Sequence, residues 1–129
     1  MKSPANVYGY PPEVWRRFCA CAHAGVLAGE GVIAAEAGSV AARSLLKISA
    51  RVRNRAIAEA RFQAYGCPTT VAVGDWLAER LQGQPVSTLQ SGGFEAASIR
   101  QALEIGEAQT HCALMGVDLI RALSQQAVN

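Results

Sequence analysis

Two runs of alternating residues on either side of Asn54 constrain the fold of this chain most strongly. In each run, small or apolar residues alternate with a second set, which is the period of two of a half-buried strand. The sets are Leu46, Ile48, Ala50 and Val52 against Lys47, Ser49, Arg51 and Arg53, then Ala58, Ala60, Phe62 and Ala64 against Ile57, Glu59, Arg61 and Gln63. Because Asn54 can adopt a left-handed turn conformation, the pattern predicts an antiparallel hairpin.

Helical patterns lie on both sides of this hairpin. Before it, two prolines at 11 and 12 precede apolar residues at helical spacing, which predicts a helix ending near Gly25. After it, the pattern changes at Cys67, because Pro68 suits the first turn of a helix and Gly83 suits its end. A strand therefore runs directly into a helix at Cys67.

The remaining segments complete the predicted fold. Residues 26–39 are rich in Gly and Ala and fit a flexible segment or a short edge strand, while residues 84–93 fit a linker with one short turn. Residues 94–104 predict another helix, and a last helix is predicted to start near His111. Strands followed by helices predict an α+β fold, a small antiparallel sheet of about three strands packed by helices, as a single domain over residues 1–129.

Charge and hydropathy narrow the function classes. Twelve basic and ten acidic residues give a net charge of +2, which provides no general attraction to nucleic acid or to an anionic membrane. The apolar runs are interrupted well before the roughly 18 residues of a membrane-spanning helix. The first residues match neither a secretory signal nor a transit peptide, so we expect a soluble, cytoplasmic protein. The local cluster Arg51, Arg53 and Arg55 favours a solvated hairpin tip over a docking patch for an acidic partner.

The four cysteines need an explanation other than disulfides, because a reducing compartment keeps thiols free for metal binding or catalysis. Cys67 and Cys112 are both predicted at the first turn of a helix, where free N–H groups and the helix dipole favour the thiolate. His111 adds an imidazole, and the resulting S, N, S set suits zinc or iron-sulfur ligation. The ordinary alternative is that both cysteines are small buried side chains and His111 is a helix-capping group.

The residues around Cys67 also resemble a known family. Residues 58–68, AEARFQAYGCP, precede a helix that carries Trp76 and Leu77, and His111–Cys112 leads into the terminal helix. This arrangement resembles the IscU-type iron-sulfur scaffold, the domain also found at the amino end of NifU. The resemblance covers the chain from about Ser44 onward and implies an α+β, SufE/NifU-like fold with a three-stranded sheet.

The resemblance implies a function. In that family a cysteine desulfurase delivers sulfur as persulfide to the thiols of the scaffold, iron joins it, and a [2Fe-2S] cluster is built and passed on. It therefore implies a non-enzymatic protein that binds iron or a [2Fe-2S] cluster, or alternatively zinc, through Cys67, His111 and Cys112. We expect a cysteine desulfurase and cluster acceptor proteins as its partners, and a monomer or weak homo-oligomer.

The chain departs from the family pattern in its ligands. The family uses three cysteines, a histidine and an aspartate, of which Cys67 matches the second cysteine and Cys112 the third. The first cysteine and the aspartate belong to a Cys-Gly-Asp motif before the second strand. The candidates here are Ala37-Gly38-Ser39 and Ala42-Arg43-Ser44, and in both Ala replaces the thiol and Ser the carboxylate. Since a [2Fe-2S] cluster takes four protein ligands, the standard site is incomplete.

The N-terminal helix offers replacements for the missing ligands. Cys19 and His23 are four residues apart and could chelate from one helix face, while Cys21 points elsewhere. Cys19 also lies in an apolar stripe with Trp15 and Phe18, which favours a core position for it.

A further departure concerns a chaperone partner. The family carries a Leu-Pro-Pro-Val-Lys segment before its Ile-His-Cys motif, and a specialised DnaK-like chaperone binds that segment. This chain has Ile-Gly-Glu-Ala-Gln-Thr over residues 105–110 instead. We therefore do not expect release of a cluster by that chaperone.

Three functional hypotheses follow. The first is an IscU-like protein of iron-sulfur cluster assembly. The second is a zinc-binding or protein-binding relative that modulates a cysteine desulfurase without building a cluster, because a fold can persist after its chemistry is lost. The third is a thiol enzyme with Cys67 as nucleophile and His111 as base, although no orienting acid or oxyanion motif accompanies these residues.

Overall fold

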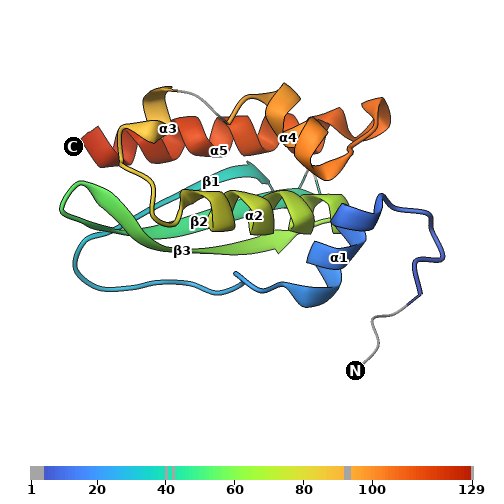
Figure 1. Cartoon of the computed structure of the whole chain (residues 1–129), viewed down its shortest axis with the longest axis horizontal. Coiled ribbons are helices and arrows are strands. Elements are labelled where there is room, and N and C mark those ends of the chain that lie inside the picture. The colour runs from blue at the N-terminus through green and yellow to red at the C-terminus, as the bar shows by residue number, and fades with distance from the viewer. Residues whose placement is uncertain (1–4, 40, 42, 92–93, 129) are drawn as a thin grey trace.

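A three-stranded antiparallel sheet in the order β1-β2-β3 is central to the computed structural model, which describes residues 5–39, 41, 43–91 and 94–128. In chain order the elements are α1 (Pro12–Ala20), β1 (Val32–Ser39), β2 (Ser44–Arg53), β3 (Ala56–Tyr65), α2 (Pro68–Leu81), α3 (Thr88–Ser91), α4 (Ala96–Leu103), the 3-10 helix η1 (Glu107–Gln109) and α5 (Thr110–Val128). α5 packs on β1 and β2, and α2 on β2 and β3 (Figure 1). The predicted α+β fold is therefore confirmed, while the single domain over residues 1–129 stays a prediction.

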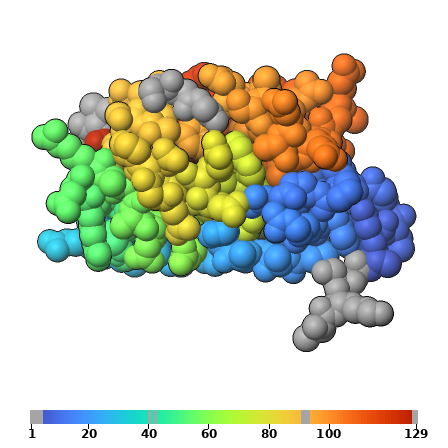
Figure 2. Space-filling view, in the orientation of Figure 1, coloured from blue at the N-terminus to red at the C-terminus, as the bar shows by residue number. Residues whose placement is uncertain are grey.

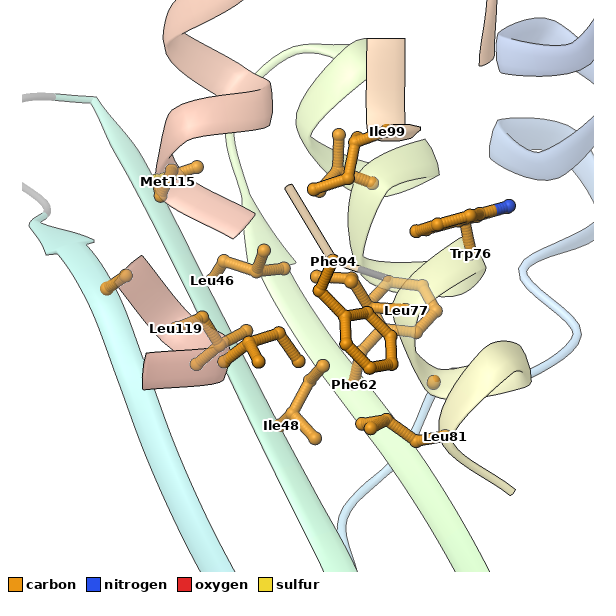
Figure 3. Close-up of a cluster of buried hydrophobic side chains, with 14 of the residues drawn as sticks. Leu46, Ile48, Phe62, Trp76, Leu77, Leu81, Phe94, Ile99, Met115 and Leu119 are labelled. Carbon is orange, nitrogen blue, oxygen red and sulfur yellow. The ribbon is translucent and has the colours of Figure 1, made fainter. Parts of the chain in front are cut away.

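The core lies between the sheet and the two long helices. Leu46 of β2 and Phe62 of β3 extend toward Leu77 of α2 and Leu119 of α5, and all four are at most 2 % exposed (Figure 3). A Cβ atom at Gly74 would come within 2.6 Å of the side chains of Leu46 and Phe62. A glycine in the middle of α2 thus allows the helix to lie close to the sheet.

The β2–β3 hairpin turns where the sequence predicts it. Asn54 and Arg55 both have left-handed φ angles, 51° and 64°, which suits a two-residue hairpin loop. Arg53 and Arg55 are exposed at this tip, as expected. Arg51 lies further back, and its guanidinium donates hydrogen bonds to the carbonyl oxygens of Ala28 and Glu30. One arginine of the cluster therefore holds the preceding loop instead of facing only solvent.

A β-bulge changes which side chains face the core at the start of β3. The register places Arg51 opposite Glu59 and Val52 opposite Ile57, so Ala58 is an extra residue in β3. The bulge reverses the side-chain alternation: Ile57 is fully buried and Ala58 is exposed, whereas the sequence pattern places Ala58 in the inward row. Simple alternation over a strand cannot predict such an insertion.

The first helix is shorter than predicted. α1 ends at Ala20 and not near Gly25, because Cys21 adopts a left-handed conformation with φ 43°. The N–H of Cys21 donates to the carbonyl oxygen of Arg17 at 2.8 Å, which closes the helix. Cys19 and His23 therefore do not share a helix face, and α1 does not form the chelating pair that their spacing allowed as an alternative.

The first strand is longer than predicted. β1 covers eight residues, Val32–Ser39, and pairs with β2 along its whole length. Residues 26–31 are irregular. The strand is rich in Ala and Gly and has weak β propensity, so its pairing with β2 and its contact with α5 define it.

A network of charged groups fixes α1 to α2. Arg17 of α1 is 7 % exposed and donates from Nη1 to Oδ2 of Asp75 in α2 at 2.8 Å. The same guanidinium also pairs with Glu13 and Glu79. The backbone N–H of His23 donates to Oδ1 of Asp75 at 3.0 Å. Asp75 thus joins the end of the N-terminal segment to the middle of α2.

The remaining helices follow the sequence expectations. The helix predicted after Cys67 is α2, the helix predicted over residues 94–104 is α4, and the last helix starts at Thr110. The linker predicted over residues 84–93 contains the four-residue helix α3. Among the described residues, no helix combines the length and the apolar character that crossing a membrane requires.

Candidate metal or sulfur site

Cys67 occupies the junction between β3 and α2. It is the N-cap residue of α2, with Pro68 at the first helical position. The preceding Gly66 has φ 149°, and a Cβ atom there would lie 3.0 Å from Oγ1 of Thr70. Only a glycine allows the chain to turn here without displacing Thr70. The Tyr65-Gly66-Cys67 motif therefore places the Cys67 thiol at the N-terminus of α2.

Cys112 approaches from the second long helix. It is the third residue of α5 and is fully buried, while the neighbouring His111 is exposed. α2 and α5 both begin at the end of the molecule opposite the β2–β3 hairpin tip (Figure 1). That end also carries α1, and the hairpin tip forms the other end of the surface (Figure 2). The fold therefore brings together two cysteines that are 45 residues apart in sequence, at positions 67 and 112.

The two thiols share two polar neighbours. Oγ1 of Thr70 lies 3.7 Å from Sγ of Cys67 and 3.6 Å from Sγ of Cys112. Oε1 of Gln109 lies 4.0 Å from Sγ of Cys67 and 3.7 Å from Sγ of Cys112. Nε2 of His111 lies 3.5 Å from Sγ of Cys112. The structure thus brings Cys67 and Cys112 together around shared neighbours, while His111 lies next to Cys112 only.

Thr70 and Gln109 are site residues that the sequence analysis does not identify. Each lies one helical turn from a cysteine, Thr70 three residues after Cys67 and Gln109 three residues before Cys112. Residues three apart on a helix are neighbours, so this spacing is the signal that could find them.

The pKa values of the two thiols are shifted in opposite directions. A hydrogen bond from Cys112 lowers the pKa of Cys67 to about 4, with further help from the backbone N–H groups of Thr69 and Thr70 and the Thr70 hydroxyl against the effect of burial. The same hydrogen bond and burial raise the pKa of Cys112 well above its ordinary value. The pair therefore holds one thiolate at Cys67 and one protonated thiol at Cys112 at neutral pH.

The segment beside Cys67 contains the second candidate for the missing ligands. A Cβ atom at Gly66 would lie 3.4 Å from the carbonyl oxygen of Arg43, and Leu45 pairs with Tyr65 across β2 and β3. Ser44 therefore begins β2 next to the Tyr65-Gly66-Cys67 turn. The position of Ala42 lies outside the described residues.

The first candidate, Ala37-Gly38-Ser39, ends β1. Ala37 is a core residue at 9 % exposure, and a Cβ atom at Gly38 would come within 2.7 Å of the sulfur of Met115 in α5. Neither candidate segment carries a thiol or a carboxylate, so the ligand deficit inferred from the sequence persists on both alignments.

Cys21 and His23 in the N-terminal segment have partners of their own. Sγ of Cys21 donates to the carbonyl oxygen of Phe18 at 3.0 Å, and Nδ1 of His23 lies 3.3 Å from Oδ1 of Asp75. Cys19 is partly buried on α1. Within the described residues, no three or more His, Cys, Asp or Glu side chains form a group arranged to hold a metal ion. Completing a site at Cys67 therefore requires a further donor or a shift of His111 toward Cys67.

The sequence as a whole matches a known domain family, the NifU-like N terminal domain, over residues 9–127. The chain belongs to this family. Among its relatives is the iron-sulfur cluster assembly scaffold protein IscU of Escherichia coli K12, which is 28 % identical over 95 residues, 73 % of this chain and 70 % of the relative. IscU of Haemophilus influenzae Rd is 26 % identical over 86 residues, 66 % of this chain and 67 % of the relative.

Solved structures support the same fold. The N-terminal part of a nitrogen-fixing NifU-like protein from Brucella abortus superimposes with a TM-score of 0.68 at 12 % identity, covering 91 % of this chain and 92 % of that chain. FiSufU from the thermophile Fervidobacterium islandicum AW-1 gives a TM-score of 0.67 at 12 % identity, covering 92 % and 99 %. The resemblance to the IscU and NifU scaffolds inferred from the motif around Cys67 is confirmed as family membership and as fold.

Proposed function

We propose that this protein takes part in iron-sulfur cluster assembly as an IscU-type scaffold, holding iron, a [2Fe-2S] cluster or zinc as cargo at Cys67, His111 and Cys112. The observation that supports this most is the convergence of two thiols from the first turns of α2 and α5 around the Thr70 hydroxyl. Thiolate sulfur with imidazole nitrogen is a donor set that suits these metals. Membership of the NifU-like N-terminal domain family supports the same assignment.

The sulfur donor in this proposal is a cysteine desulfurase, and Cys67 is the thiol that receives its sulfur. Cys67 is partly exposed and has the lowered pKa, whereas Cys112 is fully buried and protonated. A thiolate is the nucleophile in thiol–persulfide exchange, so Cys67 reacts first. Cluster acceptor proteins complete the set of partners.

A second function is favoured by the positions that lack donors. Ala and Ser stand in both candidate segments for the first family cysteine and the aspartate. A zinc-binding relative that modulates a cysteine desulfurase, without building a cluster, can hold its metal with three protein ligands and a water, whereas a [2Fe-2S] cluster takes four protein ligands.

Anaerobic reconstitution with ferrous iron, sulfide and a cysteine desulfurase tests the proposal. We expect the visible absorption of an iron-sulfur cluster in the unmodified protein and its loss in Cys67→Ser and Cys112→Ser. Cys21→Ser is the matched control, because that thiol bonds to Phe18 and lies outside the site, and it should retain the absorption.

The outcomes separate the two functions. A colourless protein that binds zinc through Cys67 and Cys112 would move the assignment to the modulating relative. A cluster spectrum that survives in both site variants would refute the assignment of the ligands.

A further inference from the structure

The side chain of Gln109 contacts both thiols. Its Oε1 lies 4.0 Å from Sγ of Cys67 and 3.7 Å from Sγ of Cys112. Gln109 is the last residue of η1, whose backbone is closed by a hydrogen bond from its N–H to the carbonyl oxygen of Gly106 at 3.1 Å. The amide oxygen is therefore positioned by a short helix and not by a free loop.

Thr70 and Gln109 contact the same two sulfurs from different environments. Thr70 is fully buried, whereas Gln109 is partly exposed. The Thr70 hydroxyl belongs to the interior, where it can hydrogen-bond to a thiolate. Of these two residues, only Gln109 is in contact with solvent.

Three separations between these donor atoms are close to those in a metal site. Zinc binds sulfur at about 2.3 Å and nitrogen or oxygen at about 2.1 Å in a tetrahedron, which places neighbouring S and N or O donors about 3.6 Å apart. Sγ of Cys112 lies 3.5 Å from Nε2 of His111 and 3.7 Å from Oε1 of Gln109. The separation of 4.0 Å from Cys67 to Gln109 is slightly longer.

We propose that Gln109 supplies the fourth donor, through its side-chain carbonyl oxygen, to a divalent metal ion held by Cys67, Cys112 and His111. This inference rests on the proposed function, since it assumes that those three residues bind metal. It accounts for a site that lacks the first family cysteine and the aspartate, because the missing donor comes from the segment just before Cys112. The proposed set also requires His111 to move toward Cys67, since within the described residues the three His and Cys side chains do not yet form a metal-binding group.

Competitive titration of the metal-free full-length protein with zinc and a chelator tests this inference. We expect Gln109→Ala to bind zinc about 10-fold to 100-fold more weakly than the unmodified protein. Gln109→Glu should bind at least as tightly as the unmodified protein, because it keeps an oxygen at that position and adds a charge. Gln101→Ala, which removes an exposed glutamine from α4, is the matched control and should leave the affinity unchanged.

The visible absorption of bound cobalt provides a second measurement, and loosened packing alone would not shift its bands. In the Co²⁺-loaded protein, Gln109→Glu should shift the visible d–d bands while the thiolate-to-cobalt charge-transfer bands remain. The urea midpoints of the metal-free variants show whether each one folds.

The zinc affinities of these variants distinguish a failure of the role of Gln109 from a failure of the proposed function. Zinc affinity of Gln109→Ala within threefold of the unmodified protein, or a loss that Gln109→Glu does not restore, would overturn the role of Gln109. In either case, a loss of zinc in Cys67→Ser and Cys112→Ser would leave the proposed function standing. If those two serine variants also bind zinc like the unmodified protein, the proposed function itself fails.

Discussion

At the scale of single residues, two cysteines of the same site have different chemistry. Cys67 receives a hydrogen bond from Cys112 and lies at the N-terminus of α2, so its pKa falls to about 4. Cys112 is fully buried and keeps its proton. The difference arises from placement in the fold, because both residues begin as ordinary thiols with a pKa near 9.0.

Alkylation of the metal-free protein by iodoacetamide should report this difference. A lowered pKa keeps the thiolate populated as the pH falls, until the pH reaches the lowered value. Cys67 should therefore react at nearly the same rate at pH 6 as at pH 8, whereas an ordinary thiol slows about tenfold for each pH unit below its pKa. Peptide mass spectrometry should find the label on Cys67 and not on Cys112.

A variant identifies the cause of this reactivity. Cys112→Ala removes the hydrogen bond to Cys67, so the pKa of Cys67 should rise and its labelling at pH 6 should slow. A labelling rate of Cys67 in the unmodified protein that already falls about tenfold per pH unit between 8 and 6 would contradict the account.

The sequence predicts correctly where the two cysteines lie, while the metal or sulfur site that they form stays a prediction. Cys67 and Cys112 are both found at helix N-termini, as their flanking residues indicate. Thr70 and Gln109 are not predicted, because a spacing of three residues from a cysteine does not by itself mark a hydroxyl or an amide as part of a site until the opposite helix is known. Their role is defined by contacts across two helices, which no local pattern contains.

At the scale of elements, one buried ion pair fixes α1. Arg17 and Asp75 have side chains that are 8 % and 4 % exposed, and Asp75 also accepts the N–H of His23. Breaking a buried pair is costly, since the remaining charge is left without its partner in a region of low dielectric.

We expect Asp75→Ala to lower the free energy of unfolding by about 3 kcal/mol, at the low end for such pairs because Arg17 retains Glu13 and Glu79. Asp118→Ala is the matched control: its pair with Arg121 is 67 % exposed on the aspartate side and should contribute less than about 1 kcal/mol. Urea unfolding of both variants measures the difference. Equal destabilisation would show that the buried pair does not anchor α1.

Some of these elements can be predicted from the local sequence, and others cannot. The hairpin, α2 and α5 are predicted because their periodicities and terminal residues agree. β1 is only partly predicted, because Ala and Gly have weak strand preference. The bulge at Ala58 is not predicted, because a pattern of alternating residues does not reveal one inserted residue. The end of α1 depends on a left-handed Cys21, a conformation that a non-glycine residue seldom adopts.

In the whole molecule, the order and direction of the elements bring Cys67 and Cys112 together. β3 leads into α2 without a loop, and α5 begins at the same end of the sheet (Figure 1). Two thiols that are distant in sequence therefore meet beside the Tyr65-Gly66-Cys67 turn.

The central claim is that Cys67 and Cys112 hold a metal ion or cluster together. Elemental analysis of the freshly purified protein, per mole of chain, tests it most directly. We expect about one zinc or about two irons per chain, lost in the double variant Cys67→Ser/Cys112→Ser and retained in Cys19→Ser/Cys21→Ser. Metal content that is the same in both double variants, or absent from the unmodified protein, would contradict it.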